Sequence, residues 1–424
     1  METTRRRFIK TGSAAVAATA LLPKPFVSAQ SGPVKVGVLT VKSGVLASIG
    51  DCGLRAVQWA ADKINGSGGI LGRKIELIVE EESNPKDTVQ RFRKLYLRDG
   101  VDVVSGGIST GVGLSLGPAA EEMKKLWLSW DATTQKGVEE TMPKAQYAFR
   151  STDNECEAIQ AALMTVRHYK GKIKTVAGIN TDFSYGRNIW DTFLAIAKKY
   201  DMGVSVVSDL WVKVGTTDLT SYVAALQQAK PDLIFSSLLF ADMPIFMKQA
   251  HAAGLTKNTK FVFPAAGFQH TKLEKSFTPE GMILGHNTMY FEQPGASALL
   301  KEFVRDYQAK YKEPPHFEAD RAYFTVAAYK AAVEKAAKAI GGKWPSTEQV
   351  AEALRGIEVE SLGGKVRYRV DQIPECNFYA GFTTHKNSYE FCTIDRIETM
   401  NTDQLQKPAG ADFFKWIETM NWKV

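Results

Sequence analysis

One short segment of the sequence combines glycines with hydroxyl side chains in a pattern that suits the binding of an anion. The segment from Ser105 to Gly111 contains Ser109 and Thr110 and lies between a predicted strand and a predicted helix. The start of a helix presents unpaired N–H groups and a positive dipole end, which attract a carboxylate. We therefore predict that Ser109 and Thr110 bind a carboxylate. The alternative is that their hydroxyl groups simply cap the helix.

Acidic and aromatic side chains follow several other predicted strands. Asp131 can receive a cationic or hydroxyl group, whereas its neighbour Trp130 forms either an aromatic wall or part of the core. Asp182 directly follows a strand of the second half of the chain. Phe240 and Asp242 follow a later strand, and Asp242 either binds a ligand or caps a helix.

The elements that carry these residues alternate between strand-like and helix-like patterns. Val34 to Leu39 alternates with a period of two, and apolar residues from Leu54 to Ile64 then recur at helical spacing. The alternation begins again after Phe149, with a helix from Glu155 to His168 and a strand from Ile173 to Ile179. Such βαβ series predict parallel sheets covered by helices on both faces. We expect an α/β fold of two doubly wound, Rossmann-like lobes joined by a hinge.

Ligands of open α/β sheets bind outside the carboxyl ends of the strands, so two facing lobes predict a site in the cleft between them. We predict that residues 33–149 and 290–372 form lobe 1 and that residues 150–289 and 373–424 form lobe 2. The helical stretch from Ala298 to Ile340 is expected to return to the first lobe.

The first 29 residues have the composition of an export signal. Arg5-Arg6-Arg7 precedes the short apolar stretch from Ala14 to Leu22, and small residues end at Ala29. The arginines before Phe8 resemble a twin-arginine signal. We predict cleavage after Ala29 and a periplasmic mature chain; the alternative is an exposed basic N-terminus on a cytosolic protein.

Composition and charge indicate a globular protein and argue against a membrane-spanning or nucleic-acid-binding one. The chain is 44% hydrophobic and 23% charged, as in globular proteins, and it has no apolar run long enough to span a membrane. Residues 1–29 carry five basic side chains and one acidic one, so +4 of the net charge of +7 lies there and +3 remains for the rest. We therefore expect no nucleic-acid partner.

The four cysteines are too few for a disulfide scaffold, and no spacing indicates a metal centre or a cofactor. Cys376 and Cys392 lie in or beside two apolar runs near the C-terminus. If these runs pair as neighbouring strands, the two sulfurs can form a disulfide, and both the bonded and the free state remain open. Cys52 and Cys156 are expected to be small buried side chains.

The sequence resembles type I periplasmic solute-binding proteins of ABC importers, in the class that binds leucine, isoleucine and valine. The resemblance rests on Ser43-Gly44, Asn65 to Leu77, Asn84-Pro85, Phe183 to Gly186 and Gln249 to Leu255, which occur in the family's order. It implies a periplasmic protein that captures an amino acid or related small carboxylate in the interlobe cleft. It further implies delivery to permease subunits at the inner membrane, without catalysis or a cofactor.

The same resemblance assigns roles to individual residues. Ser109 falls at the family's carboxylate-binding serine, Thr133 at a threonine that grips the ligand's α-groups, and Tyr185 at a tyrosine that closes over the ligand.

One departure from the family concerns the ligand's ammonium group. The class carries a carboxylate where this chain has Ala265 and Ala266. Burying an ammonium without a partner costs several kcal/mol, so the loss of this acid matters. Either Asp131 or Asp242 replaces it, or the ligand is an aromatic or aliphatic carboxylate without an ammonium. The apolar walls for such a ligand are predicted to be Trp130 and Phe268.

Two other functions share some of these features. Gly111 to Gly117 approximates the glycine pattern of nucleotide-binding folds, with Asp131 about twenty residues further on, which would fit an exported oxidoreductase with a nucleotide cofactor. However, these glycines follow the third predicted strand and not the first, and their spacing is one residue too long. A ligand-sensing receptor module would have the same fold as a transport protein.

Overall fold

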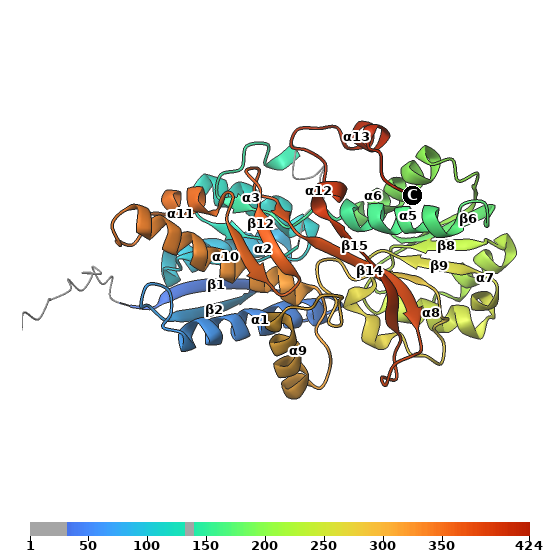
Figure 1. Cartoon of the computed structure of the whole chain (residues 1–424), viewed down its shortest axis with the longest axis horizontal. Coiled ribbons are helices and arrows are strands. Elements are labelled where there is room, and N and C mark those ends of the chain that lie inside the picture. Colours follow the sequence, from blue (N-terminus) through green and yellow to red (C-terminus); the bar gives the residue numbers. More distant parts are fainter. Residues whose placement is uncertain (1–31, 132–139) are drawn as a thin grey trace, which may run out of the picture.

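Two separate β-sheets organise the chain, one in each of two lobes that lie side by side (Figure 1). The computed structural model describes residues 32–131 and 140–424. The predicted signal segment 1–29 and the candidate ligand residue Thr133 lie outside the described residues. The prediction of an α/β fold with two lobes is confirmed.

The sheet of lobe 1 has five parallel strands in the order β2-β1-β3-β4-β5. Its strands are β1 (Val34–Thr40), β2 (Ile75–Glu81), β3 (Val103–Gly106), β4 (Trp127–Leu128) and β5 (Ala148–Phe149). Helices α1 (Ala47–Gly66) and α10 (Glu318–Ala339) pack together on one face, and α2 (Pro85–Lys94) and α3 (Thr110–Met123) on the other. Val103 and Val104 therefore belong to different cores, because successive side chains of a strand point to opposite faces.

The sheet of lobe 2 has seven strands in the order β15-β14-β10-β9-β8-β6-β7. Five are parallel and the last two of the chain are antiparallel. They are β6 (Thr175–Thr181), β7 (Ser205–Val212), β8 (Leu233–Ser236), β9 (Lys260–Phe263), β10 (Ile283–Gly285), β14 (Asn377–Thr384) and β15 (Thr393–Asn401). Helices α5 (Glu155–Tyr169) and α6 (Ser184–Lys199) cover one face, and α7 (Thr220–Ala229) and α8 (Asp242–Ala252) cover the other.

The remaining elements cover the edges and ends of the lobes. They are α9 (Ala298–Tyr311), α11 (Thr347–Leu354), α12 (Thr402–Leu405), α13 (Phe413–Thr419), a small antiparallel sheet of β11 (Glu358–Ser361), β12 (Gly364–Tyr368) and β13 (Pro374–Glu375), a π-helical turn η1 (Leu95–Asp99), and the 3-10 turns η2 (Leu255–Lys257), η3 (Ala266–Phe268) and η4 (His270–Lys272). No helix within residues 32–131 and 140–424 is both long and apolar enough to cross a bilayer.

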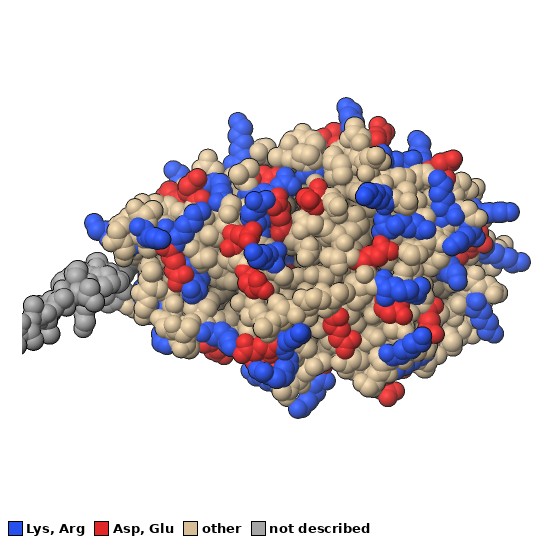
Figure 2. All heavy atoms as spheres, in the orientation of Figure 1, with Lys and Arg blue, Asp and Glu red and all other residues tan. Residues whose placement is uncertain are grey.

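The chain passes between the two lobes three times. It leaves the first sheet after β5, returns with α10 after β10, and enters the second sheet again at β14. On the face shown in Figure 2, lysine and arginine side chains are interspersed with aspartate and glutamate.

The disulfide considered for Cys376 and Cys392 is not formed in this structure, where all four cysteines are free and buried. The two apolar runs do pair, as β14 and β15, but the strands are antiparallel and Thr384 lies opposite Thr393. Cys376 precedes β14 and Cys392 precedes β15, so the two thiols lie at opposite ends of the pair. An eight-residue strand spans about 25 Å, whereas a disulfide needs Cα atoms within about 7 Å.

Candidate ligand-binding site

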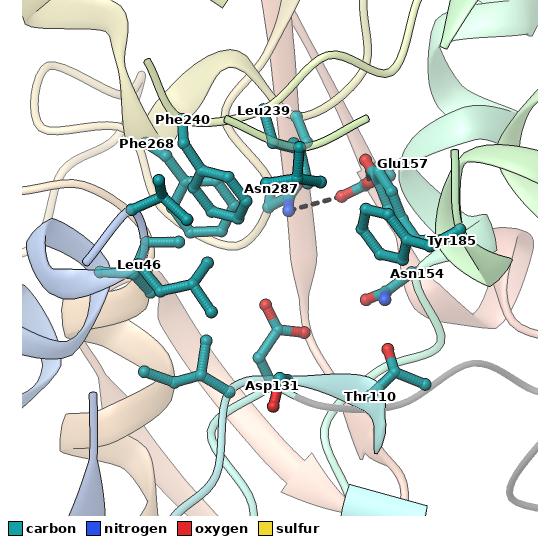
Figure 3. Close-up of a pocket in the computed structure, with 17 residues that line it drawn as sticks. Leu46, Thr110, Asp131, Asn154, Glu157, Tyr185, Leu239, Phe240, Phe268 and Asn287 are labelled. Atoms are coloured by element: carbon teal, nitrogen blue, oxygen red, sulfur yellow. Dashed lines mark hydrogen bonds between the residues drawn. The ribbon is translucent and has the colours of Figure 1, made fainter. Parts of the chain in front are cut away.

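A cavity of about 180 Å³ lies between the lobes, where the carboxyl ends of both sheets meet (Figure 3). An engineered apolar cavity of about 150 Å³ holds benzene, so this one has room for a single ring or a branched aliphatic chain. Lobe 1 lines it with Val45, Leu46, Ile49, Ile108, Ser109, Thr110 and Asp131, and lobe 2 with Asn154, Glu157, Phe183, Tyr185, Val214, Leu239, Phe240, Ala265, Phe268 and Asn287.

One wall of the cavity is apolar and aromatic. The rings of Phe240 and Phe268 have centroids 6.3 Å apart, and Phe268 packs in turn against Phe317, with the ring planes tilted by 48° and the centroids 4.3 Å apart. Phe240 follows β8 in a left-handed backbone conformation, with φ of 54°. That conformation costs about 1–3 kcal/mol in a non-glycine residue and persists only where the surrounding structure enforces it.

The opposite wall is polar and belongs to lobe 2. Glu157, in the first turn of α5, accepts a hydrogen bond from the Tyr185 hydroxyl and another from Asn287 Nδ2 at 2.7 Å. Burial raises the pKa of Glu157 from 4.5 to about 7, although these hydrogen bonds and the nearby Arg321 guanidinium oppose the shift. The Glu157 carboxyl therefore changes its charge close to neutral pH.

The floor of the cavity carries a buried ion pair from lobe 1. Asp131 follows β4 and points into the cavity in Figure 3, and its Oδ1 lies 3.0 Å from Nη1 of Arg321 in the first turn of α10. Glu318, one turn earlier on α10, is fully buried, and burial and the Asp131 charge raise its pKa well above the usual range. One buried guanidinium therefore lies among three acidic side chains.

Ser109, one of the residues predicted to bind a carboxylate, is already engaged by a carboxylate of the chain itself. Glu82 directly follows β2 and is only 2% exposed. Its carboxylate accepts the N–H of Ile108 at 2.7 Å, the N–H of Ser109 at 2.8 Å and the Ser109 hydroxyl at 2.7 Å. The Ser109 hydroxyl does not cap α3 either. A ligand carboxylate can reach these donors only if it displaces Glu82.

Several of the predicted site residues do meet in this cavity. Ser109 and Thr110 at the start of α3 and Asp131 after β4 line its lobe 1 side, as expected for residues that follow strands. The lobe 2 side contains the predicted residues Tyr185, Phe240 and Phe268.

Trp130 and Ala266 lie beside the cavity without lining it. The Trp130 side chain is fully buried in lobe 1, where its indole N–H donates to the Ser105 hydroxyl at 2.7 Å and its ring packs against Gly53. It is therefore part of the core. Ala266 is buried in the second core of lobe 2, and its neighbour Ala265 faces the cavity instead.

The other two acidic candidates have local partners away from the cavity. The half-exposed Asp182 pairs with Arg187 five residues later, with a distance of 2.6 Å between Oδ1 and Nη2. Asp242, at the start of α8, accepts the backbone N–H of Gly215 at 3.0 Å and so fixes the loop after β7. Of the two replacements considered for the missing family acid, only Asp131 lies at the cavity.

Sequence reasoning missed Glu82, Glu157 and Asn287. Glu82 and Asn287 follow the strands β2 and β10, so inspection of every strand end would have included them. Glu157 lies inside a helix, and no local pattern distinguishes it from other acidic helix residues.

The glycines that approximate a nucleotide-binding pattern lie within α3 and after the third strand. They therefore do not form the phosphate-binding loop that a dinucleotide fold places after its first strand.

Comparison with known proteins agrees with this architecture. Residues 33–381 match the family described as periplasmic binding protein. The chain is 26% identical to Leu/Ile/Val-binding protein homolog 7 of Brucella abortus (strain 2308), over 67% of this chain and 72% of that protein. It is 25% identical to the Leu/Ile/Val-binding protein BraC3 of Rhizobium johnstonii, over 83% and 91%.

The fold is also similar to that of a solute-binding protein of an ABC transporter from Rhodopseudomonas palustris BisB5, solved in complex with 3,4-dihydroxybenzoic acid. The TM-score is 0.75 at 23% identity, and the match covers 88% of this chain and 98% of the other. The chain belongs to the periplasmic binding protein family. The proteins of this family act in solute binding and transport, and membership implies a periplasmic location.

Proposed function

We propose that this protein is the solute-binding component of an ABC importer and captures a small solute in the cavity between its lobes. The observation that carries the proposal is the cavity itself, which both lobes line and which has the volume of a single ring or a branched chain. The names of the relatives support a solute of amino-acid size, and the complex of the Rhodopseudomonas protein supports a small aromatic molecule of similar size.

Transport would use closure of the two lobes around the solute. We propose that lobe 1 (residues 33–149 and 290–372) and lobe 2 (residues 150–289 and 373–424) move about the three connecting segments. Thr110 and Asp131 line the cavity from one lobe and Tyr185 and Phe268 from the other. A solute held between them would therefore stabilise the closed form. Permease subunits at the inner membrane would recognise that form.

We further propose that residues 1–29 are a twin-arginine signal that directs the folded chain to the periplasm. Mass spectrometry of the exported protein is expected to find an N-terminus at Gln30. Replacement of Arg5, Arg6 and Arg7 by lysine is expected to block export. An intact N-terminus on exported protein would contradict this part of the proposal.

Binding can be tested with the mature protein and a thermal-shift screen of amino acids and single-ring compounds. A true ligand at a hundredfold excess over its Kd stabilises the folded state by about 2.7 kcal/mol. Phe268→Ala is expected to weaken binding at least tenfold, because it removes half of the aromatic wall. Phe414→Ala, on the exposed face of α13, is the matched control and should leave affinity unchanged. Equal affinities for both variants would refute the site.

A further inference from the structure

The polar side of the cavity determines which polar group a ligand can present. Some of the donors that could bind a ligand anion there already bind the carboxylate of Glu82. Glu82 occupies the N–H groups of Ile108 and Ser109 as well as the Ser109 hydroxyl. Because Glu82 is buried at the base of this loop, an incoming carboxylate competes with an anion that the chain itself supplies. These particular donors are therefore available to a ligand carboxylate only if Glu82 moves away.

The polar wall presents hydrogen-bond acceptors. Glu157 is 4% exposed and Asn287 is 2% exposed, and both line the cavity. The Nδ2 group of Asn287 donates to Glu157, so the amide oxygen is the free end, and it has no hydrogen-bond partner among the described residues. A buried acceptor without a partner is costly unless a ligand or water supplies a donor.

The charges around the cavity also favour a donor. Asp131 and Glu157 face the cavity from opposite lobes, and no lysine or arginine lines it within the described part of the chain. The guanidinium of Arg321 pairs with Asp131 and does not line the cavity. An ammonium entering this space meets carboxyl oxygens on two sides, whereas a carboxylate meets like charge.

We propose that the ligand is a small apolar amine, recognised through its ammonium group by Glu157 and Asn287 and not through a carboxylate. This assignment rests on the proposed function, because it names the ligand class of the same cavity. The apolar body lies against the wall formed by Phe240 and Phe268, and the nitrogen donates to the Glu157 carboxylate and to the Asn287 amide oxygen.

The test compares three probes that share one branched body and differ only in their charged ends. Isopentylamine carries the ammonium alone, 4-methylpentanoate the carboxylate alone, and leucine carries both. Isothermal titration calorimetry of the wild-type mature protein at pH 8 is expected to give a Kd for isopentylamine at least a hundredfold lower than that for 4-methylpentanoate, with leucine between them. Benzylamine and benzoate form a second pair with the same expected order.

Two variants assign the effect to Glu157. Glu157→Gln keeps the size of the side chain, removes its charge, and is expected to weaken isopentylamine binding at least tenfold. Glu155→Gln is the matched control, because Glu155 is a buried acid of the same helix that does not line the cavity. It should leave the affinity unchanged. The probe comparison uses the wild-type protein and therefore stands even if a variant fails to fold.

The possible outcomes separate the two proposals. Binding of a carboxylate probe as tightly as its amine would overturn the amine assignment and leave the proposed function standing. Equal weakening by Glu157→Gln and Glu155→Gln would also overturn it. A complete absence of binding for all five probes would count against both the amine assignment and the proposed function.

Discussion

The most specific prediction about this site concerns the buried carboxylate of Glu82, which binds the backbone of Ile108 and Ser109. Glu82→Ala removes the acceptor of two backbone N–H groups and of the Ser109 hydroxyl. Hydrogen bonds to a charged group contribute about 1.5–3 kcal/mol each, but burial raises the pKa of Glu82 and offsets part of that gain. We expect a net loss of about 2–4 kcal/mol in the free energy of unfolding, and about half of that for Glu82→Gln.

The stability arm of this test is urea-induced unfolding followed by tryptophan fluorescence. Glu81→Ala is the matched control, because the neighbouring Glu81 is the last residue of β2 and its carboxylate accepts a surface hydrogen bond from Ser43 at 2.9 Å. We expect that control to change stability by no more than about 0.5 kcal/mol.

The binding arm asks whether the vacated N–H groups accept a ligand carboxylate. We expect Glu82→Ala to bind 4-methylpentanoate at least tenfold more tightly than the wild type does, because the competing internal carboxylate is gone. If Glu82→Ala lowers the free energy of unfolding by less than about 0.5 kcal/mol and leaves the affinity for 4-methylpentanoate unchanged, Glu82 does not block carboxylate binding at Ile108 and Ser109.

Three further predictions follow from buried ionisable groups. Burial raises the pKa of Glu157 from 4.5 to about 7, so the folded state keeps this proton to a higher pH than the unfolded chain does. The stability that protonated Glu157 contributes is fully present below pH 4.5, and about 3 kcal/mol of it is lost as the pH rises from 4.5 to 7. Glu157→Gln cannot lose a proton, so urea titrations should show its free energy of unfolding rising relative to that of the wild type across this pH range. Arg321→Met leaves Asp131 without its cation and is expected to cost about 3–5 kcal/mol, and a loss below 1 kcal/mol in the same titrations would contradict a buried ion pair. Thiol titration without reductant should find four reactive thiols per chain in denaturant and none in the folded protein, whereas two in denaturant would indicate a disulfide.

The fold could be predicted well because it depends on periodic patterns. The inner strands, such as β3 and β8, are buried on both faces, and the covering helices have an apolar side, so the alternation of strands and helices can be seen in the sequence. The sequence pattern does not show whether the two C-terminal strands, β14 and β15, pair parallel or antiparallel. Two apolar runs predict neighbouring strands, but only their antiparallel register separates Cys376 from Cys392.

The site could be predicted only in part, for a geometric reason. Residues that follow parallel strands gather at one edge of a sheet, and this rule found Thr110, Asp131 and Tyr185. It does not tell which way each side chain points, and Asp242 turns instead to a neighbouring loop. Glu157 meets Asn287 only through tertiary folding across 130 positions of sequence, so no local pattern indicates their contact.

The most direct test of this account is a crystal structure of the mature protein with isopentylamine. We expect the amine nitrogen within hydrogen-bonding distance of the Glu157 carboxylate, the branched chain against the rings of Phe240 and Phe268, and Glu82 still bound to Ser109. A ligand outside the interlobe cavity, or 4-methylpentanoate seated on the Ser109 N–H in place of Glu82 in a parallel crystal, would contradict it.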